Sequence, residues 1–383
     1  MIITLVVDQY KNINNGTTAT ARHLSERLVK RGHTVRILTA SKGVVDKNIQ
    51  ENNIFVTEER IFPGFMHLIH GNGMVIAKAD KKVMREAFEG ADLVHFMFPF
   101  NLMKKGKSIA DAMGIPSTAA FHIPPEHITC NIGLRQCKPL CSTIYRAWRK
   151  HFNRFNHVHT PSIKMKTILE GYGYKSNIHA ISNGVSDVYC KTDFPKPAEL
   201  EDKFVILSSG RLASEKRHKD IVNAVALSKY NSRIQLMFCG KGTKEKSLIK
   251  LAAKKLENPL MIKFCDRQEL LNIINYSDLY VHASEVEAEA ISCMEAFVCG
   301  TVPIIASAPR SASSQFALSE HNLFKSRNVV ELAEKIDWMI ENPQEKTRME
   351  EEYLEYGKNF RLEICVDALE KVFLQAIEEK EGK

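Results

Sequence analysis

The chain lacks the features that would place it in a membrane or in a disulfide-stabilised class. It has no run of about 18 apolar residues, so no segment is expected to span a bilayer. The opening stretch MIITLVVDQY is too short and uncharged for a signal peptide and predicts a strand. The nine cysteines include no CxxC pair, which favours a reducing, cytosolic compartment. Cys130, Cys137 and Cys141 also lack zinc-type spacing, so no metal site is expected there.

The chain carries a modest excess of basic residues, and these are unevenly distributed along it. The 53 basic and 45 acidic residues give a net charge of +8. Between residues 101 and 178 only three acids, Asp111, Glu126 and Glu170, stand against a dozen basic residues. Those basic residues are Lys104, Lys105, Lys107, Arg135, Lys138, Arg146, Arg149, Lys150, Arg154, Lys164, Lys166 and Lys175. The first half of the chain is therefore expected to prefer anionic surfaces.

Short β-branched or aromatic runs alternate with helix-length amphipathic segments along the whole chain. IITLVV and TVRILTA are two such runs, and residues 18–31 show helical spacing between them. The pattern restarts after Pro195-Lys196-Pro197. We therefore expect an α/β fold of two doubly wound, Rossmann-like domains, with the ligand at the strand carboxyl ends. The expected domains are residues 1–195, to which a last helix at 360–383 could return, and residues 200–355.

The segment after the first strand carries a single glycine and no GxGxxG pattern. In NNGTTATARHL, residues 14–24, Gly16 precedes a predicted helix whose N-terminus could receive an anion or sugar hydroxyls. A helix capped by Thr17 or Thr18 explains the same residues equally simply. Because no GxGxxG pattern follows the first strand, a nicotinamide site has little support here.

A second segment, SSGRLASEK, ends a strand where a parallel sheet presents its ligand face. Gly210 ends the strand, and Arg211 and Lys216 follow five residues apart. A fork-shaped guanidinium and a compact ammonium at this place suit a diphosphate. A solvated basic loop is the alternative.

The segment SEVEAEAISCMEAFVCG places carboxylates around a predicted helix that is otherwise apolar. Glu287 lies in the loop before the helix, and Glu295 lies inside it, eight residues later. A buried carboxylate needs a hydrogen-bonded partner, and two vicinal sugar hydroxyls would supply one. A helix-capping Glu287 and a core Glu295 paired with Lys or Arg are the alternative.

Together these segments resemble the retaining glycosyltransferases of family 4, which have the GT-B fold. Glu287 and Glu295 match the E-x7-E signature, SSGRLASEK is similar to the GRL…K segment, and TPS and ISNGV resemble two further landmarks. The resemblance runs in family order from residue 5 to about residue 310. It implies two domains that face each other across a cleft, the first for the acceptor and membrane, the second for a nucleotide sugar.

The resemblance also implies a role for each matching residue. Arg211 and Lys216 would hold the diphosphate of the sugar donor. Glu295 would bind the ribose hydroxyls, and Glu287 would hold hydroxyls of the transferred sugar. Because the family generally works without a bound metal and no DxD occurs, neither a metal nor another cofactor is expected.

Further residues take roles from their place in the same alignment. His122 would lie beside the anomeric carbon, although a satisfied histidine at a strand end is the alternative. Gly16 and Gly210 would admit close backbone approach, and the backbone at Ala290 and Ile291 would face the phosphate. His95 aligns with a further family histidine.

One departure from the family pattern concerns the loop before the helix. The family usually has E-G-F-G where this chain has Glu287-Ala288-Glu289-Ala290. Alanine is tolerable there if its φ stays negative. Our hypothesis is that Glu289, a second carboxylate near the donor, tunes the choice of sugar.

The stretch IYRAWRKHFNRF interleaves aromatic and basic residues and bears on the acceptor. Its residues Tyr145, Arg146, Trp148, Arg149, Lys150, Phe152 and Arg154 have the composition of a helix that docks on anionic lipid. The alternative is an ordinary surface helix with an aromatic core face. No nucleic-acid-binding motif accompanies it.

The expected function is retaining transfer of glucose or galactose from a UDP-sugar to a lipid, diacylglycerol or ceramide. The enzyme would lie peripherally on the cytoplasmic face of the membrane. This follows from the chain's resemblance to a bacterial, glycolipid-forming branch of the family. A soluble or polysaccharide-precursor acceptor stays open. A GT-B nucleotide-sugar epimerase and a non-catalytic binding module are the further alternatives.

Overall fold

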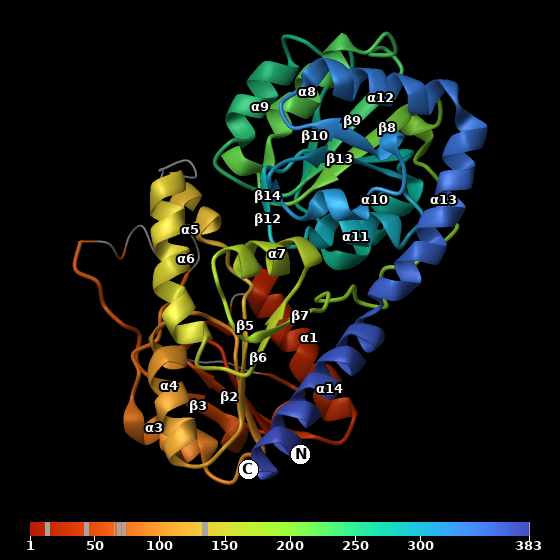
Figure 1. The fold of residues 1–383 in the computed structure, drawn as a ribbon. Coiled ribbons are helices and arrows are strands. Elements are labelled where there is room, and N and C mark those ends of the chain that lie inside the picture. Colours follow the sequence, from red (N-terminus) through yellow and green to blue (C-terminus); the bar gives the residue numbers. More distant parts are fainter. Residues whose placement is uncertain are drawn as a thin grey trace. The chain divides into compact units, whose positions relative to one another are not determined.

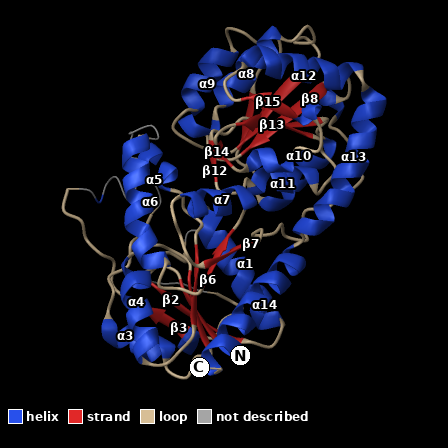
Figure 2. Ribbon diagram, viewed as in Figure 1, coloured by secondary structure: helices blue, strands red, loops and turns tan. Residues whose placement is uncertain are grey.

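The computed structural model describes residues 1–11, 16–41, 46–64, 66, 70, 74–131 and 137–382. The chain divides into two compact units. Unit 1 consists of Met1–Asn183 and Leu362–Lys383, and unit 2 of Gly184–Arg361. Each is a parallel sheet with helices on both faces, and Figure 2 shows these helices flanking the strands. The predicted class of two doubly wound α/β units is confirmed.

Unit 1 is built on a seven-stranded parallel sheet in the order β3-β2-β1-β4-β5-β6-β7. The strands are β1 (Ile2–Val6), β2 (Thr34–Thr39), β3 (Ile54–Val56), β4 (Leu93–Phe96), β5 (Ser117–Ala120), β6 (His157–Thr160) and β7 (Asn177–Ala180). The helices are α1 (Gly16–Lys30), α3 (Lys81–Phe88), α4 (Asn101–Ala112), α5 (Pro125–Asn131), α6 (Lys138–Phe152), α7 (Ile163–Gly171) and α14 (Leu362–Glu381). The strand order reverses between β1 and β4, so ligands are expected at the carboxyl ends beside that point.

Unit 2 repeats the arrangement with six parallel strands in the order β10-β9-β8-β11-β13-β15. The strands are β8 (Phe204–Ser209), β9 (Ile234–Cys239), β10 (Met261–Lys263), β11 (Leu279–His282), β13 (Pro303–Ser307) and β15 (Leu323–Lys325), with a small second sheet of β12 (Val286–Glu287) and β14 (Arg310–Ser311). The helices are α8 (His218–Leu227), α9 (Glu245–Ala252), α10 (Arg267–Tyr276), α11 (Ile291–Phe297), α12 (Val329–Glu341) and α13 (Pro343–Gly357). Here the order reverses between β8 and β11, the two strands that precede the predicted sugar-donor residues.

The cores explain why these segments became strands. All four residues of β4 and all six of β9 are buried, as expected of parallel strands covered on both faces. The helices contribute one apolar face each; on α1 that face includes Ala21, Leu24 and Leu28. A histidine or carboxylate at the end of such a strand therefore lies at a buried edge of the sheet.

The C-terminal helix returns to unit 1 and is held there by ion pairs. Figure 1 shows α14 beside α1, and Arg31 contacts three carboxylates of α14. Its guanidinium nitrogens lie 2.7 Å from Glu363, 2.6 Å from Asp367 and 2.7 Å from Glu370. The helix thereby closes unit 1 over its histidine-containing face.

The boundary between the units lies earlier than the proline-containing linker suggested. Residues 184–195 belong to unit 2, where Asn275 of α10 accepts from the Thr192 amide at 2.7 Å and donates to the Cys190 carbonyl at 3.1 Å. Unit 2 also extends to Arg361 rather than to residue 355. Hydrogen bonding to α10, rather than the position of the prolines, therefore sets the boundary. Among the helices of the described residues, none combines the length and the apolar character needed to cross a membrane.

Candidate functional site

The predicted sugar-donor residues of unit 2 meet at the carboxyl edge of its sheet. Lys216 ends the short 3-10 turn that follows β8, and Glu287 ends β12, which follows β11. The Lys216 ammonium donates to Glu287 Oε1, and both side chains are mostly buried. The two residues expected to hold the diphosphate and the sugar thus pair with each other.

A histidine that the sequence analysis missed completes this pair. His282, the last residue of β11, is buried, and its Nε2 lies 3.3 Å from Glu287 Oε1. Burial lowers the pKa of His282, although the nearby carboxylate opposes the shift. A polar residue at the end of the otherwise apolar run DLYVHAS was the available signal. The neutral imidazole leaves Lys216 as the cation that balances Glu287.

Arg211 is held in the same loop but has a different partner. Its guanidinium is 2.8 Å from Glu215, and the side chain is half-exposed. The Glu285 amide also donates a hydrogen bond to the Glu215 backbone carbonyl at 2.8 Å. Glu215 therefore links the loop after β8 to the loop after β11, and it too was not predicted.

The backbone around Gly210 is crowded in a way that requires glycine. Gly210 has φ +132°, and a Cβ at Gly240, which follows β9, would lie 1.9 Å from the Gly210 carbonyl oxygen. The Gly210 amide also donates to the Cys239 carbonyl at 2.9 Å. Close packing of these two loops fixes the strand end from which Arg211 projects.

Glu295 lies on α11, as predicted, and has a protein partner. The Tyr189 hydroxyl donates to its carboxylate, and the charge of Arg267 acts on it from nearby. Burial raises the pKa of Glu295 to about 7 in spite of these groups. The partner was missed because Tyr189 lies in the segment that the sequence analysis assigned to the other domain.

The loop between Glu287 and α11 departs from the expectation for its alanines. Ala290, which precedes α11, has φ +85° and ψ 57°, in the left-handed region that favours glycine. The expectation of a negative φ there is wrong, since the turn into α11 requires the conformation that the family glycine supplies. Ile291 is half-buried at the start of this helix, and Glu289 is 3 % exposed.

Gly16 is the first predicted site residue of unit 1 along the chain. Gly16 begins α1 with no positive φ, and a Cβ there would meet no described atom within 4 Å. Asn14 and Asn15 of the same motif, and the basic residue Arg135, lie outside the described residues. Nothing in the described surroundings therefore requires glycine at this position.

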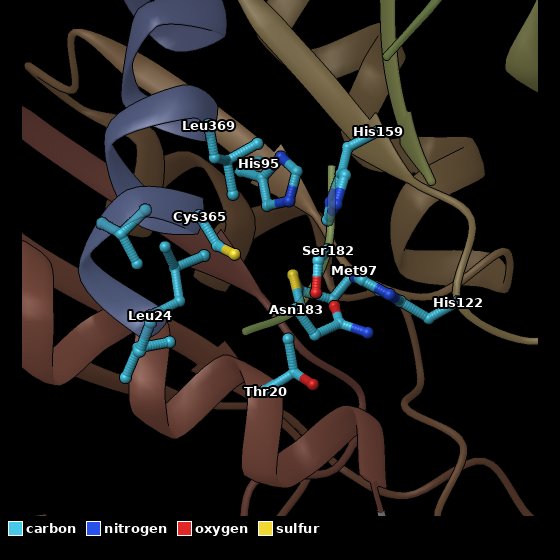
Figure 3. A pocket seen from close by; sticks show the side chains of 12 residues that line it. Thr20, Leu24, His95, Met97, His122, His159, Ser182, Asn183, Cys365 and Leu369 are labelled. Atoms are coloured by element: carbon cyan, nitrogen blue, oxygen red, sulfur yellow. The ribbon is translucent and has the colours of Figure 1, made fainter. Parts of the chain in front are cut away.

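His122 lines a small cavity of about 20 Å³ beneath α14, with His95 and His159 beside it. Figure 3 shows the three imidazoles around this space, with Cys365 and Leu369 of α14 opposite. His122 Nε2, His95 Nε2 and His159 Nδ1 are buried and have no hydrogen-bond partner among the described residues. The volume admits about one water molecule, which could bridge such nitrogens.

Burial keeps these histidines neutral. It lowers the pKa of His95 to about 3 and that of His159 to about 4, and it lowers the pKa of His122 as well. Among the described residues, no cluster of three or more His, Cys, Asp or Glu side chains is arranged to hold a metal ion.

The predicted membrane helix requires a correction. Tyr145 and Phe152 of α6 are 1 % and 0 % exposed, and Trp148 is partly buried. All three rings pack around Phe121, which follows β5, with centroids 5.2–6.0 Å apart. Their spacing of three and four residues places them on one helix face, and that face covers the sheet. The aromatic residues therefore form core, as the alternative interpretation held.

The basic residues of α6 are on its other side. Arg146 and Lys150 are exposed, while Arg149 is half-buried and donates to the Tyr172 carbonyl at 2.9 Å. Arg154 reaches α4, where it donates to the Lys104 carbonyl and to Ser108. Together with Lys104 and Lys105, these exposed residues form a basic face across α4 and α6, hereafter the basic face.

Comparison with known proteins gives the class to which this fold and site belong. Residues 14–188 match the family model Glycosyltransferase Family 4, and residues 191–357 match Glycosyl transferases group 1. The chain belongs to the glycosyltransferases of the GT-B fold. The predicted family is confirmed.

Two solved structures agree with this chain in fold, and a third is similar in sequence to part of it. HepE of Anabaena, in complex with UDP and glucose, is 18 % identical, with 98 % of this chain and 100 % of that chain covered and a TM-score of 0.74. A glycosyltransferase of Rickettsia africae is 19 % identical over 98 % of each chain, with a TM-score of 0.72. The catalytic domain of a cholesterol-α-glucosyltransferase of Helicobacter pylori is 43 % identical over 41 % of this chain and 99 % of that one, with a TM-score of 0.38. No curated protein matches the chain.

The strained residue in the sugar-donor loop gives the first prediction. Ala290→Gly should raise the free energy of unfolding of unit 2 by about 1 kcal/mol, because it removes the cost of a left-handed alanine. Ala288→Gly, two residues earlier and without a positive φ, should lower it by about 0.5 kcal/mol by loosening the unfolded chain. Urea unfolding followed through Trp338, in a Trp148→Phe background, reports on unit 2. Equal changes in the free energy of unfolding for the two substitutions would contradict backbone strain at Ala290.

The histidines of unit 1 predict a dependence of stability on pH. The pKa values of His95, His159 and His179 lie at about 3, 4 and 4, below the ordinary 6.5. Between pH 6.5 and 4 the unfolded chain therefore binds protons that the folded chain does not, and stability falls as pH falls. Each histidine contributes about 1.4 kcal/mol per pH unit, while Asp8, whose pKa burial raises to about 7, opposes one of them.

Urea unfolding of unit 1 at pH 7.5, 6 and 5, read through Trp148 in a Trp338→Phe background, measures this slope. His159→Asn should reduce the slope by one histidine's contribution. A slope that the substitution leaves unchanged would show that His159 does not titrate as its burial requires.

Proposed function

We propose that this protein is a retaining glycosyltransferase that moves glucose or galactose from a UDP-sugar to a lipid alcohol, diacylglycerol or ceramide, at the cytoplasmic face of the membrane. The observation that carries the proposal is the Lys216–Glu287 pair at the point where the strand order of unit 2 reverses. It brings a cation for a phosphate and a carboxylate for sugar hydroxyls to one place.

The sugar donor would bind by exchanging protein partners for its own groups. Its diphosphate would take Lys216, with Arg211 as a second, half-exposed cation. Glu287, released from Lys216, would accept hydroxyls of the sugar, and Glu295 would accept ribose hydroxyls in place of the Tyr189 hydroxyl. HepE, which has the same fold, was solved with UDP, with UDP and glucose, and with UDP-glucose. A UDP-sugar is the donor we propose here.

The proposed reaction depends on stabilising the leaving group. The C1–oxygen bond of the sugar breaks with its electron pair on the diphosphate, whose charge Lys216 and Arg211 neutralise. The acceptor hydroxyl attacks C1 from the same face, and its proton passes to the diphosphate oxygen. Glu287 holds sugar hydroxyls in this scheme and forms no covalent intermediate. Neither a metal nor another cofactor takes part.

Support for a membrane-bound acceptor comes from the basic face of unit 1. Exposed Lys and Arg side chains on adjacent helices attract anionic lipid headgroups by about 1 kcal/mol each. With Tyr145 and Phe152 in the core, this contact would be electrostatic and would not insert aromatic rings into lipid. The enzyme would then be peripheral, and its binding would weaken as salt rises.

The test is a matrix of UDP- and GDP-hexoses against lipid and soluble acceptors, with products identified by mass and the new anomeric linkage by NMR. We expect transfer from UDP-glucose or UDP-galactose to diacylglycerol or ceramide with the donor's α configuration kept. Transfer to soluble sugars alone would contradict the lipid acceptor, and inversion would contradict the mechanism. Epimerised UDP-sugar formed without any acceptor would favour an epimerase. Tight UDP binding without turnover would favour a binding module.

The same donor panel tests the role proposed for Glu289. Glu289→Gln should change the ratio of kcat/KM between UDP-glucose and UDP-galactose, because it alters charge near the sugar while keeping shape. An unchanged ratio with unchanged turnover would refute that role.

A further inference from the structure

A pocket of about 740 Å³ opens in unit 1 at the carboxyl ends of β1, β2 and β3. It lies on the other side of β1 from the histidine cavity, and none of the residues assigned a role above lines it. Its volume falls within the range of pockets that hold drug-sized molecules. We name it the arm pocket, after the segment that forms its outer wall.

That wall is formed by residues 57–64 after β3, by His70 and by residues 74–80 before α3. Its two limbs pair at Glu59 and Ala77, where the Arg60 amide donates to the Ile76 carbonyl at 2.7 Å. The returning limb is attached to two side chains that follow β1. Asp8 Oδ1 accepts from the Ala77 amide, and Gln9 Oε1 accepts from the Val75 amide, both at 2.9 Å. The wall is therefore held in place by the sheet before any ligand arrives.

Gln9 offers this pocket an unused hydrogen-bond donor. The side chain is 2 % exposed and lines the pocket, and its Nε2 has no hydrogen-bond partner among the described residues. A buried amide without a partner costs about 1–3 kcal/mol, so a ligand oxygen that accepts from it would be favoured. Ser41, after β2, is a second polar group in the lining.

The charges of the lining select against an anionic ligand. Glu58 lies 2.7 Å from the Lys78 ammonium, and Glu59 lies 2.6 Å from His70 Nε2. Both carboxylates line the pocket, with Lys11 as the cation beside them. A phosphate would face two carboxylates, whereas alcohol hydroxyls can donate to them.

The rest of the wall is apolar. Val75 and Met74 on the returning limb are partly buried, and Ile61 on the outgoing limb is 72 % exposed. The polar groups that follow β1 and β2 thus lie at the strand ends, whereas the arm combines polar side chains with the apolar ones of Ile61, Met74 and Val75. A ligand that fits both has a hydroxylated head and an apolar body.

We infer that the arm pocket binds the acceptor of glycosyl transfer, and that this acceptor is an uncharged alcohol with an apolar body. The inference rests on the proposed function, which supplies the sugar. The acceptor oxygen forms the new bond to C1 of the sugar as described above, and the pocket itself only binds and orients. Gln9 and Ile61 are then residues that determine acceptor specificity.

A pair of matched surface substitutions tests the apolar wall. Ile61→Asp places a charge on the arm, and Ile163→Asp places one on α7, where the side chain is 71 % exposed. Neither position is packed in a core, so both variants should fold. With dioctanoylglycerol as acceptor, Ile61→Asp should raise the acceptor KM about tenfold, the loss of about 1.4 kcal/mol of apolar contact. Ile163→Asp should leave it unchanged.

A third variant tests whether the Gln9 side-chain amide binds the acceptor. Gln9→Glu keeps an oxygen to accept from the Val75 amide and replaces the unpartnered NH₂ donor with a second, acidic oxygen that cannot donate when ionised, so it should lower kcat/KM for the acceptor about tenfold. Hydrolysis of UDP-glucose without acceptor should be the same in all variants. An acceptor that carries a phosphate in place of the hydroxyl head should be used at least tenfold less efficiently than dioctanoylglycerol.

Calorimetric titration of dioctanoylglycerol without any donor separates the two levels of this account. If it binds the wild type and not Ile61→Asp, the pocket is supported even where no UDP-sugar is turned over, and only the proposed donor fails. Equal binding to wild type, Ile61→Asp and Ile163→Asp would overturn the inference. Efficient use of the phosphate-bearing acceptor would overturn it as well.

Discussion

A mostly buried ion pair between Lys216 and Glu287 is the interaction on which the candidate site depends. It joins the loop after β8 to the loop after β11, across the point where the strand order of unit 2 reverses. Removal of one partner from such a pair costs about 3–5 kcal/mol, because the other charge is left buried. The pair therefore holds the two loops and both side chains in place. In the proposed mechanism, a diphosphate that takes the lysine would free the carboxylate for sugar hydroxyls, so one exchange would prepare both halves of the site.

Backbone strain gathers around this pair. The described residues other than glycine with positive φ are Arg217, Ala290 and Arg327, and each follows a strand of unit 2 on its carboxyl side. Both arginines contact Glu285, which stands two residues before Glu287. Strain of this kind persists where the surroundings fix it, and it concentrates at functional loops. In this chain a carboxylate bound by two arginines helps to hold the loop that carries Glu287.

Much of this arrangement could be predicted from the sequence, because it depends on local patterns. The alternation of apolar runs and amphipathic segments predicted two doubly wound units, and the helical spacing of residues 18–31 corresponds to most of α1. The spacing of Glu287 and Glu295 placed Glu295 on a helix, as observed in α11, whereas Glu287 ends the short strand β12 and does not lie in a loop. Lys216 lies beside Glu287, because the neighbouring parallel strands β8 and β11 end at the same edge of the sheet.

What could not be predicted depends on contacts between distant segments. The aromatic residues of α6 have the composition of a lipid-binding face, and only the position of Phe121 shows that this face covers the sheet. The partner of Glu295 is Tyr189, more than a hundred residues away, in a segment whose membership of unit 2 depends on hydrogen bonds to α10. The arm pocket was not foreseen because Gln9 and Met74 come together only through pairing of the arm with the strand ends.

The most direct test of the account is calorimetric titration of UDP into wild type, Lys216→Met, Glu287→Gln and the Lys216→Met/Glu287→Gln double variant, with Lys250→Met on α9 as the control. The account predicts that both variants without Lys216 bind UDP at least tenfold more weakly, since they lack the phosphate's cation. Glu287→Gln should bind UDP at least as tightly as wild type, because Lys216 no longer has to break an ion pair with a carboxylate before it contacts the phosphate. Equal weakening by Glu287→Gln and Lys216→Met, or unchanged UDP binding without Lys216, would contradict the exchange on which the site is built.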